Sequence, residues 1–81
     1  MATLKDPTKQ KAICARLARV EGQLRGVQRA IKSEESCELI AQQLSAARKA
    51  LDKAFFTMVA CAIEQGDIPA DRVAKMLAKF A

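Results

Sequence analysis

A heptad repeat of apolar residues between positions 13 and 31 constrains the fold more than any other feature of the sequence. Its members are Ile13, Leu17, Val20, Leu24, Val27 and Ile31. Successive members are alternately four and three residues apart, so all of them lie on one face of a helix. The pattern predicts a helix over residues 8–32, with Pro7 near its start. An apolar stripe of this length needs another helix to cover it.

A second long helix is predicted from Cys37 to about Gln65. Ser36 is a good N-cap residue, and Gly66 and Asp67 supply a stop at the other end. One face of this helix is marked by larger apolar residues, namely Ile40, Leu44, Leu51, Phe55 and Met58. Residues 54–63 are apolar on all sides, so we expect this half of the helix to be enclosed by more than one neighbour.

The segment from Pro69 to Ala81 has the spacing of a short amphipathic helix. No segment shows the alternation of a strand. The expected fold class is therefore all-α, with two long helices and a short third in a single domain over residues 1–81.

A chain of 81 residues is marginal as an isolated globule, because it buries only about 60% of the surface that it exposes when unfolded. Apolar residues make up 51% of it and aromatic residues only 4%, so the core must come from closely packed aliphatic side chains. We therefore expect self-association. Because residues 54–63 have more apolar faces than one hairpin partner can cover, we expect a tetramer. The longest apolar run, residues 54–63, is shorter than the roughly 20 residues of a membrane-spanning helix, so no membrane association is expected.

The residue types argue against catalysis. The chain contains no histidine and no tyrosine, and it has no P-loop, nucleophile elbow or Cys-x-x-Cys motif. We expect neither an enzyme nor a bound cofactor, and we assign no metal ligands.

Three cysteines carry the most distinctive chemistry. The first residues of the chain lack the character of an export signal, so reduced thiols in the cytoplasm are expected. Cys37 begins the second helix, where free backbone N–H groups favour a thiolate, although three neighbouring glutamates oppose it. Cys61 is either a small buried hydrophobe or a second reactive thiol, and Cys14 is expected to be structural.

Helix geometry separates Cys37 from Cys61 within one chain. The two residues are 24 positions apart, which corresponds to about 36 Å along a continuous helix. If two second helices pack antiparallel, Cys37 of one chain approaches the partner's Cys61. A sensor site built from both thiols would then belong to a dimer.

Basic residues form two stripes on the first helix, in a chain with a net charge of +5. One flank carries Lys5, Lys9, Arg16 and Arg19. The face opposite the heptad carries Lys11, Arg25, Arg29 and Lys32. Either stripe suits phosphate, and either also suits a solvated helix surface. No helix-turn-helix signature accompanies them.

Residues 16–26 read RLARVEGQLRG and residues 43–53 read QLSAARKALDK, with Cys37 between them. These features resemble the CsoR/RcnR/FrmR family of small helical repressors, which includes the persulfide sensor CstR. The resemblance covers residues 8–65. It implies an antiparallel dimer of helical hairpins, paired into a disc-like tetramer. It also implies that this assembly binds operator DNA and releases it when an inducer reacts at a cysteine.

The resemblance assigns roles to individual residues. Arg16 and Arg19 match family arginines implicated in DNA binding, and Lys53 matches a basic position on the second helix with the same role. Cys37 matches the sensing cysteine. A helical scaffold that does not bind DNA is the alternative from a different class, and it predicts no salt-dependent affinity for DNA.

The sequence departs from the family at the other inducer positions. Copper, nickel and cobalt sensors carry a histidine and a further ligand where this chain has Ala62 and Gly66. Persulfide sensors have their second cysteine at the position of Gly66, five residues beyond Cys61, and formaldehyde sensors have a proline where this chain has Ala2.

These departures bear on the inducer. Cys37 and Cys61 alone are a thin ligand set for Cu(I), whereas oxidation or persulfidation needs only one reactive and one resolving thiol. We therefore expect a repressor that responds to a persulfide or redox inducer through Cys37 and Cys61. A repressor that responds to Cu(I), another metal or an aldehyde is the alternative within the family.

Overall fold

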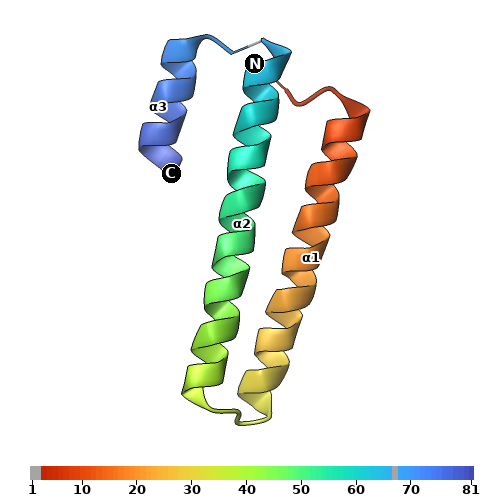
Figure 1. Cartoon of the computed structure of the whole chain (residues 1–81), viewed down its shortest axis with the longest axis vertical. Helices are drawn as coiled ribbons and strands as arrows, with labels where there is room; N and C mark the ends of the chain where they lie inside the picture. Colours follow the sequence, from red (N-terminus) through yellow and green to blue (C-terminus); the bar gives the residue numbers. More distant parts are fainter. Residues whose placement is uncertain (1–2, 67) are drawn as a thin grey trace.

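The computed structural model describes residues 3–66 and 68–81, which form three helices and no strand (Figure 1). Helix α1 spans Pro7–Lys32, α2 spans Cys37–Gln65 and α3 spans Ala70–Phe80. α1 and α2 form an antiparallel hairpin, and α3 folds back beside the C-terminal half of α2, on the side away from α1 (Figure 1). The predicted all-α protomer of two long helices and a short third is confirmed. Ala2 and Asp67 lie outside the described residues.

Asp6 fixes the start of α1. Its side-chain carboxylate accepts hydrogen bonds from the backbone N–H groups of Thr8 and Lys9, at 2.9 and 3.4 Å. Asp6 is thus the N-cap, and Pro7 occupies the first helical position, where a missing N–H costs nothing. The helix therefore begins one residue before the predicted boundary.

The turn between α1 and α2 stops the first helix and starts the second. The backbone N–H of Glu34 donates to the carbonyl of Ile31 (3.1 Å), and that of Glu35 donates to the carbonyl of Ala30 (3.0 Å). This pair of bonds is the Schellman motif, with Glu34 in the left-handed conformation (φ 56°) that usually belongs to glycine. Ser36 then caps α2 by accepting from the N–H of Leu39 at 3.1 Å, which confirms its predicted role.

Only half of the apolar heptad on α1 faces α2. Ile13, Val20 and Val27 are buried, with 4–7% of their surface exposed. The alternate members of the heptad, Leu17, Leu24 and Ile31, are 39–54% exposed. One partner helix therefore covers one row of the stripe and leaves the other row open.

The face of α2 that packs against α1 consists of small residues. Ala47, Ala54 and Cys61 are spaced by seven and are all buried. The face marked by larger apolar residues lies beside this contact line, and its Leu44 and Leu51 are nearly half exposed. Small side chains allow two helix axes to approach closely, which is why they occupy the contact line.

The apolar stretch 54–63 is not enclosed within one chain. Phe56 and Ile63 are 52% and 51% exposed although α3 lies nearby. The protomer measures 48 × 27 × 16 Å with a radius of gyration of 15.9 Å, against about 12 Å for a compact globule of this length. In the described part of the chain, no helix is both long and apolar enough to cross a membrane.

Candidate nucleic-acid interface and cysteine site

The exposed leucines of the two long helices share one broad face of the hairpin. Leu17 and Leu24 each follow a buried heptad residue by four positions, which turns them about +40° round the axis of α1 from the contact with α2. Leu44 and Leu51 each precede a buried alanine by three positions, which turns them about +60° round the axis of α2 from the contact with α1. Because the helices are antiparallel, rotations of the same sense lead to the same face. This apolar face comprises Leu17, Leu24, Ile31, Leu44 and Leu51.

The three residues predicted to bind DNA lie on the opposite face. Arg16 follows Ile13 by three positions, a rotation of about −60°, while Arg19 and Lys53 each precede a buried residue by one, about −100°. Arg19 and Lys53 are exposed and Arg16 is half-buried. The fold thus gathers Arg16, Arg19 and Lys53 from two helices into one basic face.

An ion pair between Lys9 and Glu64 closes the same face near the N-terminus of α1. The hydrogen bond that the Lys9 amine donates to Glu64 raises the pKa of that amine, and the charge of the nearby Cys61 thiolate would act in the same direction. Since the ordinary pKa of the amine is 10.5, the amine is fully charged at neutral pH, and its contribution is lost as the pH rises through its raised pKa.

The first described residues are tied to the end of α2. The backbone N–H of Lys5 donates to the side-chain oxygen of Gln65, and the amide nitrogen of Gln65 donates to the carbonyl of Thr3, both at 2.8 Å. Gln10 also donates to the carbonyl of Leu4. No local pattern in the sequence predicts the bonds of Gln65, because they join residues that are about 60 positions apart.

The three thiols occupy different places in the protomer. Cys37 is exposed at the first position of α2, at the tip of the hairpin, and it precedes Leu44 by seven residues, which puts it along the apolar face. Cys61 lies near the opposite end of α2, buried against α1, and Cys14 is exposed on α1. No disulfide joins these three thiols.

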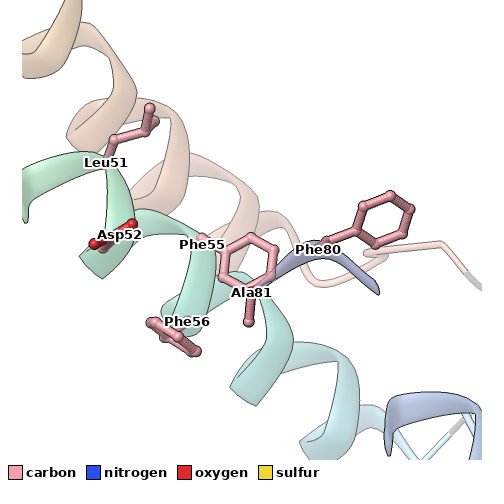
Figure 2. Close-up of a pocket in the computed structure, with 6 residues that line it drawn as sticks. All are labelled: Leu51, Asp52, Phe55, Phe56, Phe80 and Ala81. Atoms are coloured by element: carbon pink, nitrogen blue, oxygen red, sulfur yellow. The ribbon is translucent and has the colours of Figure 1, made fainter. Parts of the chain in front are cut away.

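An open hollow of about 310 Å³ lies between α2 and the C-terminal end of α3 (Figure 2). It is lined by Leu51, Asp52, Phe55, Phe56, Phe80 and Ala81. The rings of Phe55 and Phe56 meet edge to face, with centroids 5.1 Å apart. Asp52 has the only charged side chain in this lining, so the hollow offers an apolar surface and no set of reacting groups.

The donor side chains of one protomer do not fit a metal centre of the kind that the resemblance describes. Ala62 and Gly66 carry no donor atom, and Gly66 holds the left-handed conformation (φ 74°) that ends α2. Within residues 3–66 and 68–81, no group of three His, Cys, Asp or Glu side chains could hold a metal ion.

Comparison with known families identifies the chain. The model of the family described as metal-sensitive transcriptional repressor matches residues 9–79. Comparison with curated proteins and with solved structures gave no match. Since the family match spans all three helices, the chain belongs to the CsoR/RcnR-type metal-sensitive transcriptional repressors, a family of regulators and not of enzymes.

Proposed function

We propose that this repressor works as an oligomer in the cytoplasm and holds operator DNA through Arg16, Arg19 and Lys53. It releases the DNA when an inducer modifies Cys37. The observation that carries the proposal is the basic face, on which three cations from two helices lie together opposite the apolar face. Association through the apolar face would leave the cations free for phosphate.

The proposed assembly is an antiparallel dimer of hairpins, paired into a disc-like tetramer. Its support is the apolar face, whose five side chains are 39–54% exposed in the protomer. A row of large aliphatic side chains of this extent is typical of a surface that another protein covers. Cys37 lies along this face, so an antiparallel partner would bring its own α2 past that thiol.

The proposed signal is a reaction between Cys37 and the partner's Cys61. A low-molecular-weight persulfide transfers its outer sulfur to the Cys37 thiolate and leaves as a thiol, and Cys37 becomes a persulfide. The partner's Cys61 thiolate then attacks the Cys37 sulfur and expels hydrosulfide, which leaves a disulfide between the protomers. Cys61 is 9% exposed, so this step requires the end of its hairpin to open, and that movement would disturb the basic face.

The DNA-binding proposal is tested with Arg16→Ala and wild type on a fluorescent operator duplex, measured by anisotropy across a salt series. We expect the variant to bind more weakly and the salt slope to fall by about one for each phosphate that the variant no longer neutralises. Lys75→Ala, on the exposed surface of α3, is the matched control and should bind as wild type does. Equal affinities for Arg16→Ala and wild type, with a flat salt response, would support the DNA-independent scaffold instead.

The sensing proposal is tested by intact mass and non-reducing gels after exposure to a persulfide donor. Cys37→Ser should bind operator DNA and ignore the inducer, whereas Cys61→Ser should form an adduct without the crosslink. Cys14→Ser, with an exposed thiol removed, should behave as wild type does. A crosslink that persists in Cys37→Ser would show that another pair of thiols reacts.

Metal sensing is the second candidate function, and the description of the matched family favours it. The soft donors available to Cu(I) are the three thiols and the thioethers of three methionines, since the chain has no histidine. Three results together would replace the persulfide proposal with metal sensing. Cu(I) would release operator DNA from wild type but not from Cys37→Ser, and persulfide would not release DNA from wild type. An aldehyde inducer is distinguished in the same assay, because its adduct has a different mass.

A further inference from the structure

α1 carries a disproportionate share of the positive charge of the chain. It contains seven basic residues and one acidic residue, a net charge of +6, whereas the whole chain has a net charge of +5. Arg16 and Arg19 belong to the basic face, and Lys9 is paired with Glu64. The remaining cations of the helix have no role in the function proposed above: Lys11, Arg25, Arg29 and Lys32.

Three of these cations form a continuous stripe. Arg25, Arg29 and Lys32 are spaced by four and three residues, and all are exposed. Counted from the buried Ile13, they lie at rotations of about +100° to +160°, on the side of α1 turned away from α2. We call Arg25, Arg29 and Lys32 the outer edge. Lys11 shares its direction near the start of the helix.

The charges of the outer edge are not neutralised by the protomer. Within residues 3–66 and 68–81, none of the three residues forms an ion pair. A guanidinium nitrogen of Arg29 lies 3.7 Å from the point that a Cβ atom on Gly26 would occupy, so this side chain runs back along α1. Arg29 and Lys32 lie in the last turn, where cations favour the helix dipole, but Arg25 lies before that turn.

We infer that the outer edge is a second contact for the DNA backbone, beyond the contact made by Arg16, Arg19 and Lys53. The inference rests on the proposed DNA binding and extends it to phosphates further along the duplex. The outer edge lies on the same helix as Arg16 and Arg19, at least about 80° further round the helix axis. Its unpaired cations complement a polyanion. From Arg16 to Lys32 the helix advances about 24 Å at 1.5 Å per residue, a length that spans about seven phosphates at 3.4 Å per nucleotide.

Phosphate contacts carry no sequence information, so loss of the outer edge should weaken binding to any duplex equally. The triple variant Arg25→Gln/Arg29→Gln/Lys32→Gln should lose affinity by the same factor on the operator and on a random duplex. Each phosphate left without its cation lowers the salt slope by about one, which corresponds to an affinity loss of about tenfold near 0.1 M salt. Anisotropy on both duplexes across a salt series measures both quantities.

The matched control removes the same three charges from α3. Arg72, Lys75 and Lys79 are exposed, so Arg72→Gln/Lys75→Gln/Lys79→Gln reproduces the change in net charge without touching α1. Circular dichroism melts and light scattering of both triple variants report helix content and oligomeric mass. The inference is supported if the salt slope of DNA affinity falls only in the outer-edge variant and its oligomeric mass is the same as that of wild type.

Two results would overturn the inference. Equal losses in both triple variants would show that only net charge matters, and a change of oligomeric mass in the outer-edge variant would make this surface a protein interface. Failure of the proposed DNA binding looks different, because wild type itself would then show no salt-dependent affinity and Arg16→Ala would change nothing.

Discussion

Two residues hold a left-handed backbone in the described chain, and they end the two long helices. Gly66 does so after α2 (φ 74°), as glycine commonly does, and its role as a stop follows directly from the sequence. Glu34 does so after α1 (φ 56°), and no sequence rule singles out a glutamate for that position. The N-cap Ser36 was predictable because serine side chains commonly accept hydrogen bonds at helix starts. The N-cap Asp6 was not identified, although Pro7 follows it at the first helical position.

Glu34→Gly is expected to stabilise the protein. A side chain in the left-handed region costs roughly 1–2 kcal/mol, which glycine avoids, and the greater freedom of glycine in the unfolded chain offsets part of that gain. The free energy of unfolding in urea should rise by about 1 kcal/mol at fixed protein concentration.

The neighbouring residue supplies the control for this substitution. Glu35 is not in the left-handed region, so Glu35→Gly removes the same charge without relieving any backbone strain. It should be neutral or destabilising. A lower free energy of unfolding for Glu34→Gly than for wild type would contradict this account of the turn.

At the scale of helices, the hairpin depends on small side chains. α1 contributes Ile13, Val20 and Val27 to the contact between the helices. α2 contributes Ala47 and Ala54, and each of these alanines is only 3% exposed. The sequence predicted α1 and α2 closely because periodicity and caps are local signals. It did not show which heptad residues face α2, because both rows are apolar and only the partner helix distinguishes them.

Ala54→Leu is expected to destabilise the hairpin. Three extra carbon atoms at this contact force α1 and α2 apart, and overpacking of this kind typically costs about 1–3 kcal/mol. Ala41→Leu, on an exposed part of α2, adds the same volume outside the contact and serves as the control. Thermal melts of both variants measure the difference, and equal melting temperatures would mean that the two helices are not closely packed at Ala54.

For the candidate site, the sequence predicted residues but not their arrangement. Arg16, Arg19 and Lys53 were singled out by resemblance, and their common face follows from the antiparallel hairpin. The Lys9–Glu64 ion pair and the bonds of Gln65 join the start of α1 to the end of α2, residues that are far apart in the sequence, so no local pattern predicts them. The roles of Cys37 and Cys61 remain predictions.

The whole protomer is a thin rod with a small core. Ten apolar residues are buried, and none of the large side chains among the described residues is fully enclosed. Its exposed leucines outnumber those that the hairpin buries. A domain built in this way has little stability of its own, and association is expected to provide much of the rest.

Leu51→Glu is expected to dissociate the proposed oligomer, because it introduces a charge into the apolar face. Leu51 is 49% exposed in the protomer, so the variant meets no clash within its own chain. Light scattering should show a smaller mass, and the melting temperature of wild type, but not of this variant, should rise with protein concentration. An unchanged mass would place the protein interface elsewhere.

The open row of leucines has a consequence for gene regulation. If folding and assembly are coupled, the concentration of complete tetramer follows up to the fourth power of the supply of free protomers when most of the protein is dissociated. Operator occupancy would then respond to a small change in synthesis or degradation far more steeply than simple binding allows. The exposed surface of one hairpin would thereby set a threshold concentration of repressor, below which the regulated gene is transcribed with or without the inducer.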